Sequence, residues 1–254
     1  MHRFFAPSFD PGDETVALPR DEAEHLTRVL RIGVGDRVSV FDGRGHEFLA
    51  RVVSGAHRDV RVQLLSRIEP ARESSVSITL AQAVLKHDKM DDVVRDAVML
   101  GVSAIQPLVT TRTETTVAAL VRGARLDRWR RVALASAKQS RRAVLPEIRT
   151  PLTIESYLSD PPPTLRLMLV EPMIGSGGAG ESGDDVEPLS VLRGVPAPAD
   201  VALLVGPEGG WEESEVAFAS AAGVRLVSLG HRTLRADAAP VAALSVLHFL
   251  WEQP

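Results

Sequence analysis

Residues 201–230 read VALLVGPEGGWEESEVAFASAAGVRLVSLG, and this stretch decides the fold. The apolar run Val201–Val205 has the length and composition of a buried strand, and it passes directly into a loop with three glycines. A helical segment over residues 212–222 follows, and a second apolar strand covers Val224–Leu229. Strand, helix and strand in this order predict a mostly parallel α/β sheet.

The first loop, Gly206–Gly210, follows the carboxyl end of its strand, which is where open α/β sheets bind their ligands. Glycines allow a backbone to approach a ligand closely. The acidic residues Glu212, Glu213 and Glu215 favour a helix N-terminus there and disfavour a bound phosphate. Taken alone, the loop has a plain turn between strand and helix as its alternative interpretation.

A second loop, Gly230–Arg235, follows the next strand. Asp237 is a candidate N-cap for a last helix over about Ala238–Trp251, because Pro240 is tolerated only in a first helical turn. Two glycine-bearing loops at neighbouring strand ends predict a small-molecule pocket.

The same alternation of strands and helices extends upstream to residue 76. Between residues 174 and 200, Gly, Ser, Pro and acidic residues predict a flexible surface insertion. Gly101 suits the position just after a helix. The predicted strands are 76–84, 104–109 and 165–170, and the predicted helices are 90–100 and 125–142.

Residues 1–70 have a different pattern, with short strands predicted over 37–41, 47–53 and 60–68 and one helix over 21–30. Asp42-Gly43 between two of these strands is a hairpin signal. The sequence therefore predicts a small β-barrel domain over residues 1–72, a polar linker near 69–75, and an α/β domain over residues 73–254.

Composition limits the class of protein. The 254 residues are 44% hydrophobic and 24% charged, and they include no cysteine, which excludes disulfides and cysteine nucleophiles. No pair of histidines has metal-ligand spacing, so no metal is predicted. No apolar run could span a bilayer and no secretory signal opens the chain, so a cytoplasmic protein with no membrane partner is expected.

Charge is unevenly distributed. The formal net charge is −4, yet residues 112–149 carry 10 basic side chains against 3 acidic ones. This stretch predicts a phosphate-binding face, and a solvated arginine-rich helix is the alternative.

One glycine motif is discounted. Residues 175–180, GSGGAG, match the G-x-G-x-x-G pattern of dinucleotide sites. The acidic, proline-containing segment after it cannot open the helix that such a site needs, so a nucleotide-dependent oxidoreductase is disfavoured.

The ordered motifs of the chain resemble those of the RsmE family, bacterial 16S ribosomal RNA uridine-N3 methyltransferases of the knotted SPOUT superfamily. The resemblance covers nearly the whole chain. It rests on Val29-Leu30-Arg31, Asp42-Gly43, Asp88-Lys89-Met90, Leu204–Gly210 and Leu229-Gly230 with Leu234-Arg235.

The resemblance implies a PUA-like β-barrel followed by a SPOUT α/β methyltransferase domain whose C-terminal part forms a trefoil knot. It also implies a homodimer that binds S-adenosylmethionine as methyl donor and acts on 16S rRNA of the small ribosomal subunit. The implied donor contacts are Val170, Glu171, Pro172, Gly206, Pro207, Gly209, Gly210, Leu229, Gly230 and Leu234.

The uracil N3–H lies on the Watson–Crick edge, so the base must be unpaired and its proton must leave. Arg235 is the candidate for orienting the base or stabilising developing charge, and Glu208 and Asp237 are candidate proton acceptors. For Glu208, a carboxylate that braces its own loop is the alternative. The candidate RNA contacts are Arg3, Arg28, Arg31, Lys86, Lys89, Arg141 and Arg142.

Three features depart from the family pattern: His87 replaces a common glycine, Asp237–Pro240 replaces a Glu-Thr-Ala-like segment, and the 174–200 insertion is long. Two rival functions remain open. One is a knotted RNA 2′-O-ribose methyltransferase, and the other is a non-catalytic RNA-binding or ribosome-assembly protein.

Overall fold

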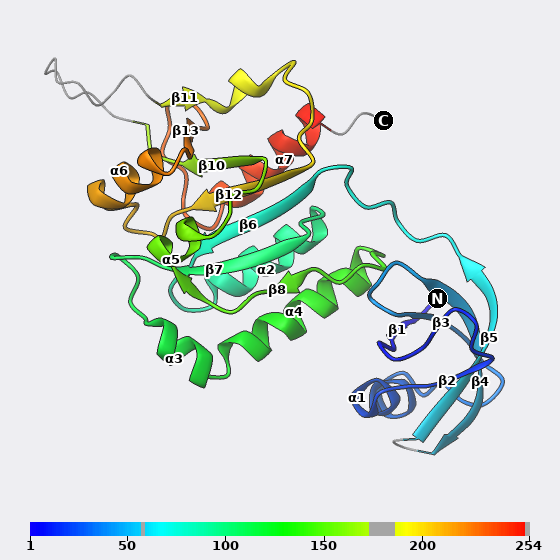
Figure 1. Ribbon diagram of the computed structural model, residues 1–254. Helices are drawn as coiled ribbons and strands as arrows, with labels where there is room; N and C mark the ends of the chain where they lie inside the picture. Colours follow the sequence, from blue (N-terminus) through cyan, green and yellow to red (C-terminus); the bar gives the residue numbers. More distant parts are fainter. Residues whose placement is uncertain (57–58, 173–185, 252–254) are drawn as a thin grey trace, which may run out of the picture. The chain divides into compact units, whose positions relative to one another are not determined.

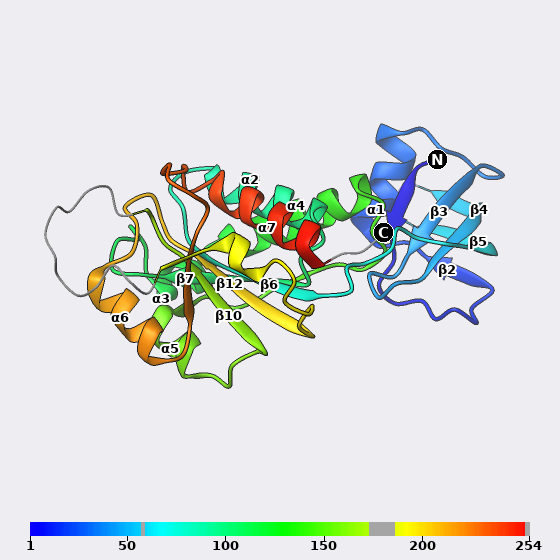
Figure 2. The ribbon, with the colours of Figure 1, turned by 90° about the horizontal axis from the view of Figure 1, so that it is seen from above.

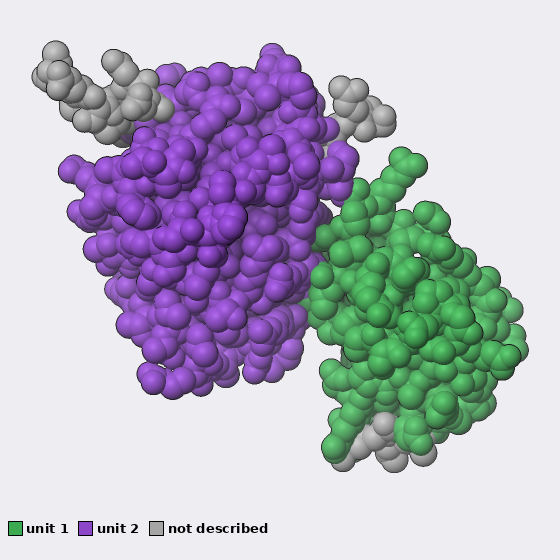
Figure 3. Space-filling view, in the orientation of Figure 1, with its two compact units in different colours: residues 1–73, 134–145 green, residues 74–133, 146–254 purple. Residues whose placement is uncertain are grey.

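The computed structural model describes residues 1–56, 59–172 and 186–251. The chain forms two compact units, coloured separately in Figure 3. Unit 1 comprises residues 1–73 and 134–145, and unit 2 comprises residues 74–133 and 146–254. The sequence prediction placed a single boundary after residue 72, and the structure adds the stretch Leu134–Leu145 to the first unit.

Unit 1 is built on a five-stranded sheet in the order β1-β3-β4-β5-β2. β3, β4 and β5 form an antiparallel meander, β2 is antiparallel to β5, and β1 is parallel to β3. The edge strands β1 and β2 do not pair with each other within the described residues, so the predicted β-barrel is a half-barrel sheet here. The strands are β1 (Arg3–Phe5), β2 (Thr15–Ala17), β3 (Arg37–Phe41), β4 (Glu47–Ala56) and β5 (Asp59–Ile68).

The core of unit 1 lies on one face of this sheet. α1 (Arg20–Glu24) continues into the π-helical turn η1 (His25–Val29), and together they carry Ala23 and Leu26 into the core. These side chains pack with Phe4, Val40 and Val62, all fully buried. Along the first half of β5, buried and exposed residues alternate, whereas β3 is buried on both faces from Val38 to Phe41.

Unit 2 is built on an eight-stranded sheet whose main path runs β11-β13-β10-β12-β6-β7-β8, with β9 also pairing β7. Every strand pair in it is parallel, which confirms the predicted parallel α/β sheet. The strands are β6 (Ser77–Ala83), β7 (Ala104–Val109), β8 (Glu147–Ile148), β9 (Leu152–Thr153), β10 (Leu165–Leu169), β11 (Glu187–Pro188), β12 (Asp200–Val205) and β13 (Arg225–Ser228).

Helices cover both faces of the unit 2 sheet (Figures 1 and 2). α2 (Lys89–Met99) and α7 (Ala239–Trp251) pack together on one face, while α5 (Ile154–Ser159) and α6 (Glu213–Ala221) pack on the other. The α5–α6 face buries Ala81, Leu108, Met168 and Leu204 from the strands. No helix of the described residues is long and apolar enough to cross a membrane.

The remaining helices are α3 (Val117–Arg122) and α4 (Arg125–Gln139). α4 buries Leu126, Trp129, Ala133 and Ser136 as its periodicity predicted. Its first residues belong to unit 2 and its last six to the unit 1 stretch.

Gly101 follows α2 with φ +96°, and the Val102 N–H bonds the Ala97 carbonyl at 3.2 Å. This is the predicted position after the helix, closed by a Schellman motif.

Two predictions need correction. The insertion predicted as flexible over 174–200 contains β11 and the 3-10 helix η2 (Leu189–Leu192), because Leu189 and Leu192 are buried apolar anchors. The glycine motif at 175–180 lies outside the described residues. The last helix begins at Ala239, and Asp237 lies before it in a turn, with its carboxylate bound to Arg235.

Candidate functional site

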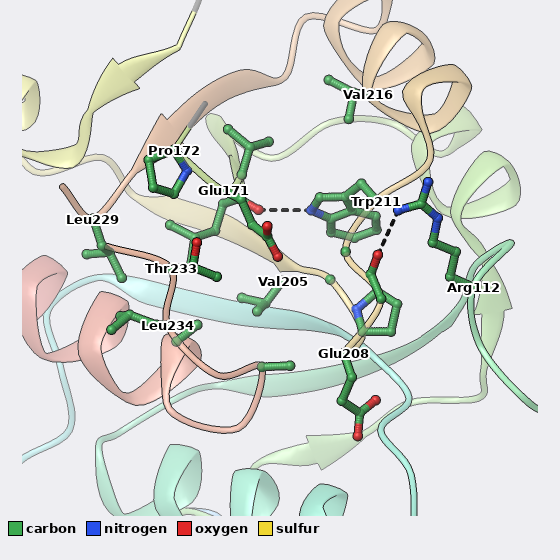
Figure 4. Close-up of a pocket in the computed structure, with 18 of the residues that line it drawn as sticks. Arg112, Glu171, Pro172, Val205, Glu208, Trp211, Val216, Leu229, Thr233 and Leu234 are labelled. Atoms are coloured by element: carbon green, nitrogen blue, oxygen red, sulfur yellow. Dashed lines mark hydrogen bonds between the residues drawn. The ribbon is translucent and has the colours of Figure 1, made fainter. Parts of the chain in front are cut away.

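A cavity of about 980 Å³ lies at the carboxyl ends of β10, β12 and β13 in unit 2 (Figure 4). Its walls come from the ends of three strands that lie side by side in the order β13-β10-β12: residues 169–172, residues 205–211 and the loop from Leu229 to Ala236. The two glycine loops were predicted at neighbouring strand ends, but β10 lies between β12 and β13. A volume of this size is at the upper end of the range for pockets that enclose a small organic ligand. The two glycine loops predicted to form a pocket thus line one cavity.

All predicted donor contacts except Gly230 line this cavity. Gly230 has φ +104°, a backbone conformation that favours glycine, so it shapes the turn that brings Leu229 and Leu234 to the cavity wall. The residues in common are Val170, Glu171, Pro172, Gly206, Pro207, Gly209, Gly210, Leu229 and Leu234.

Trp211 forms one wall of the cavity, and its indole Nε1 donates to the Leu169 carbonyl at 2.9 Å (Figure 4). A Cβ added at Gly206 would lie 3.2 Å from the Trp211 ring. Only glycine therefore lets the strand end pass this close to the indole without displacing it. Trp211 ties the end of β10 to the loop after β12.

Arg112, in the turn after β7, holds the outer part of the same loop. Its Nη1 donates to the Gly209 carbonyl at 2.7 Å, and its Nε donates to Glu212 Oε2 at 2.8 Å (Figure 4 labels Arg112). A Cβ added at Gly209 would lie 3.3 Å from the Arg112 side chain. One guanidinium thus links the loop carbonyl to the residue that caps α6.

The start of α6 is fixed by a capping box. The Glu212 side chain accepts a backbone N–H three residues on, and Glu215 Oε2 accepts the Glu212 N–H at 2.9 Å. Glu215 is buried, and its other oxygen accepts the Thr111 N–H at 2.8 Å. The acidic run after the glycine loop therefore opens a helix, as predicted from the helix dipole.

Glu208 lies in the glycine loop, and in Figure 4 its side chain points away from Glu171 and Leu229. Its Oε1 accepts the Lys86 N–H and the Lys89 ammonium, each at 3.1 Å. Burial raises the pKa of Glu208, but its own backbone N–H, the Lys89 side chain and the Lys86 N–H outweigh burial and leave the pKa below its usual value. A carboxylate held in its charged form is a weak proton acceptor, so the geometry favours the loop-bracing role.

Arg235 and Asp237 form an ion pair, with Nε to Oδ1 at 3.1 Å and Nη2 to Oδ2 at 2.9 Å. The Arg235 side chain is 74% exposed, and Arg235 lines the cavity. The two-point contact fixes the plane of the guanidinium. Asp237 therefore orients Arg235.

The structure corrects the RNA role predicted for Arg3 and Arg142. Arg3 is nearly buried, pairs with Glu47, and donates to the carbonyls of Ala137 and Lys138 in the last turn of α4. Arg142 is buried against Glu73. Both guanidinium groups are used within unit 1, so neither is available to a phosphate.

The other predicted RNA residues are at the surface. Arg28, Arg31 and Arg141 are exposed. Lys86 pairs with Glu114, and Lys89 pairs with Glu208.

Several basic side chains of the stretch 112–149 form ion pairs within the protein, so fewer of them are available to a phosphate than the composition indicated. Arg128 pairs with Asp88 and Asp91, and Arg130 pairs with Asp127. Trp129 is buried in the core, as expected for an apolar helix position.

Trp211, Arg112 and Thr233 also line the cavity and were not identified from the sequence. Trp211 directly follows the glycine loop, which was an available signal. Arg112 lies about one hundred residues upstream of the loop it holds, and no local pattern marks it.

No group of three His, Cys, Asp or Glu side chains in the described part of the chain could hold a metal ion. The cavity offers backbone groups, apolar walls and carboxylates instead.

Comparison with known proteins agrees with this arrangement. The family described as RNA methyltransferase domain matches residues 72–248, and the RNA methyltransferase PUA domain matches residues 18–65. A Synechocystis protein named ribosomal RNA small subunit methyltransferase E is 35% identical over 248 residues, which cover 94% of this chain and 75% of the relative. A protein of the same name from Rickettsia conorii is 28% identical over 98% of this chain and 96% of its own.

Two solved structures cover almost the whole chain. Ribosomal RNA small subunit methyltransferase E of Neisseria gonorrhoeae, bound to S-adenosyl methionine, has a TM-score of 0.81 at 31% identity and covers 99% of this chain and 98% of its own. A Legionella pneumophila methyltransferase with bound cofactor SAM has a TM-score of 0.83 at 29% identity, covering 97% and 96%.

One chain thus contains a parallel sheet with a pocket of glycine loops, matched by the RNA methyltransferase domain, and a unit matched by the PUA domain of such enzymes, so it is an RNA methyltransferase. This chain belongs to the RsmE family, the ribosomal RNA small subunit methyltransferases E.

Proposed function

We propose that this protein transfers a methyl group from S-adenosylmethionine to N3 of a specific uridine in the 16S rRNA of the small ribosomal subunit. The observation that carries the proposal is the cavity enclosed by the ends of β10, β12 and β13. Relatives named small subunit methyltransferase E, and a relative's structure bound to S-adenosyl methionine, support the donor and the substrate.

The residues present fit this donor. Leu226, Leu229, Leu234 and the Trp211 ring offer apolar surface for an adenine, and the glycine loop offers backbone hydrogen-bonding groups. The exposed carboxylate of Glu171 lies near Gly210, where an added Cβ would be 3.6 Å from Glu171 Oε1. A carboxylate at the wall suits a ligand with a positive sulfonium centre. When bound, the donor supplies an activated methyl group.

Arg235 is the proposed catalytic residue. As the N3 proton leaves, negative charge spreads onto uracil O2 and O4, and a guanidinium stabilises that charge in the transition state. Asp237 is the positioning residue that holds the Arg235 plane. Glu208 holds the glycine loop against Lys86 and Lys89, and Asp237 is bound at both oxygens by Arg235, so water is the proposed proton acceptor.

The trefoil knot remains part of the proposal. β13 lies beside β10 on the side away from β12, and residues 229–236 line the same cavity as residues 205–211 before α7 packs against α2. This order of strands supports the proposal of a knotted chain, an arrangement that is rare in proteins.

A homodimer and a cytoplasmic location are likewise proposed. The most exposed large apolar side chain of the described residues, Phe249 at 80%, lies on α7, which also lines the cavity through Ala239. An exposed aromatic on a structured helix fits a protein interface.

Two measurements test the proposal. Calorimetry should show that the wild-type protein binds S-adenosylmethionine. Nucleoside mass spectrometry of small-subunit particles incubated with the protein and S-adenosylmethionine should detect 3-methyluridine. A 2′-O-methylated nucleoside would establish the rival ribose chemistry, and absence of donor binding would favour a non-catalytic RNA-binding protein.

Gly206→Leu should abolish donor binding, because its Cβ alone would meet the Trp211 ring at 3.2 Å. Gly12→Leu is the control, since nothing lies within 4 Å of a Cβ there. Equal donor affinity in the two variants would exclude the pocket as the donor site.

A further inference from the structure

Three arginines lie on the outer face of the unit 1 sheet, away from its core. Arg37 of β3 is directly opposite Arg51 of β4, which is directly opposite Gln63 of β5. Residues directly opposite on paired strands point to the same face of a sheet. The neighbouring residues Val38 and Val62 are fully buried, so the Arg37–Arg51–Gln63 row lies on the opposite face of the sheet. All three residues of the row are exposed, whereas Ser39 and Phe41, further along the same face of β3, are buried.

Arg61 extends this row along β5. It lies two residues before Gln63, so its side chain points to the same face, and its strand partners are Ser54 and Ala17. All three arginines are exposed. We call Arg37, Arg51 and Arg61 the arginine face.

The guanidinium groups of the arginine face are not engaged by an acidic side chain of the described residues, although the exposed Asp59 lies two residues before Arg61 on the same face of β5. Among the described residues no ion pair or side-chain hydrogen bond involves any of the three guanidinium groups. The residues paired with them across the sheet are Gln63, Ser54 and Ala17, none of them acidic. By contrast, Arg128 and Arg130 of α4 are paired with aspartates.

Like charges placed directly opposite each other destabilise an antiparallel strand pair. Arg37 and Arg51 form such a pair, on strands about 5 Å apart. A polyanion lying across the sheet would remove this repulsion. The planar guanidinium fork is well suited to phosphate oxygens, and an exposed sheet face leaves room for an extended backbone.

We propose that the arginine face binds the phosphate backbone of the substrate RNA. This inference rests on the proposed action on ribosomal RNA and assigns an RNA-binding surface different from the residues predicted from the sequence. Contacts of this kind position an RNA without reading its bases. The face therefore contributes affinity, and the cavity of unit 2 selects the nucleotide.

The test uses the full-length protein and a 16S rRNA fragment that contains the methylated site. Arg37→Gln, Arg51→Gln and Arg61→Gln are combined in one variant, and RNA affinity is measured over a series of salt concentrations. Each lost phosphate contact should reduce the slope of log affinity against log salt by about 0.7 to 0.9, so the loss of three contacts should reduce it by about 2 to 3.

A matched control removes the same charge from paired arginines. Arg20→Gln, Arg95→Gln and Arg130→Gln change residues that are 65%, 48% and 55% exposed and that each pair with a carboxylate. This control variant should keep most of the wild-type slope. Equal slopes in the two triple variants would overturn the arginine face, because net charge alone would then explain the loss.

The failure of this inference is distinguishable from failure of the proposed function. If wild-type protein methylates the RNA and the arginine-face variant binds it with an unchanged salt slope, only the inference is wrong. If wild-type protein binds the donor but no RNA, both fail. Donor affinity of the arginine-face variant should equal that of the wild type.

The thermal stability of the Arg51→Gln variant distinguishes a role in RNA binding from a role in holding the sheet together. Arg51→Gln should raise Tm, because it removes the repulsion from Arg37 while RNA affinity falls. A lower Tm would show that Arg51 supports the sheet and would count against the proposal.

Discussion

At the scale of single residues, His87 carries a backbone strain that the sequence could only hint at. Its φ is +54°, and it is exposed. Glycine adopts this left-handed conformation without the steric cost that a side chain brings.

His87→Gly should therefore stabilise the protein by up to about 1 kcal/mol, the relieved strain being partly offset by the greater freedom of glycine in the unfolded chain. Denaturant unfolding would measure this. His25→Gly, at an exposed helical position, should instead destabilise. A loss of stability in His87→Gly would contradict the strain argument.

Arg235 is the residue on which the proposed chemistry depends. Arg235→Ala should reduce methylation by about 100-fold or more while leaving donor affinity within about twofold, since a transition-state contact changes turnover and not binding. Single-turnover assays with saturating donor would measure the rate. Asp237→Asn should give an intermediate rate, because it loosens the guanidinium without removing it.

At the scale of elements, the turn after β7 holds the glycine loop Gly206–Gly210 in place through Arg112. Arg112→Ala should weaken donor binding by about 1 kcal/mol, about fivefold, because a part-exposed ion pair and a carbonyl contact are lost. Calorimetry would detect this change, and the KM for RNA should remain the same. Arg95→Ala, which removes an equally exposed paired arginine from α2, is the control. Similar donor affinity in both variants would show that the loop holds its shape without Arg112.

The glycine loop is also tied to α2 through Glu208, and this tie depends on pH. Because the folded-state pKa of Glu208 is lowered, its stabilising contribution is present above the ordinary value of 4.5 and is lost as pH falls through the folded-state pKa. Glu208→Gln should therefore lose less stability than wild type between about pH 5 and 3. If the free energy of unfolding fell equally with pH in the two proteins, the Glu208 carboxylate would not contribute to stability in this way.

Much of the element structure followed from periodicity. The strands over 104–109 and 201–205 were predicted to within a residue or so because they are short, continuous apolar runs. The helix over 90–100 has apolar residues at helical spacing, and the helix over 212–222 was predicted from its place between two such strands.

Three-residue strands such as Arg3–Phe5 show no period, and α5 is only six residues long, so these elements were missed. The segment 174–200 was wrongly predicted to be flexible throughout. Its overall composition is polar and rich in glycine, and this average conceals Leu189 and Leu192, which are buried and anchor η2.

The residues of the site also fall into those that the sequence predicted and those that it did not. Glycine loops at strand ends are visible in sequence because they are contiguous, and they line the cavity as expected. Arg112 and the burial of Arg3 depend on residues about one hundred positions away. Only the fold brings such partners together.

At the scale of the whole molecule, the proposed homodimer makes Phe249 the residue to change. Phe249→Ser should shift the protein toward monomer in sedimentation experiments, because burial of one aromatic contributes about 2 kcal/mol per copy to an interface. Val34→Ser, which alters an apolar residue 66% exposed in unit 1, should leave the assembly unchanged. A Phe249→Ser protein that sediments as wild type would place the interface elsewhere.

The discontinuous make-up of unit 1 limits how this protein can be dissected. Arg3 donates to carbonyls of Ala137 and Lys138, and the Lys138 ammonium contacts Glu22, so residues 134–145 complete a unit that begins at the first residue. A fragment ending at residue 72 would leave Arg3 and Glu22 without those partners. The N-terminal part is therefore not a portable module, and a chimaera that exchanges it between relatives must exchange both chain segments together.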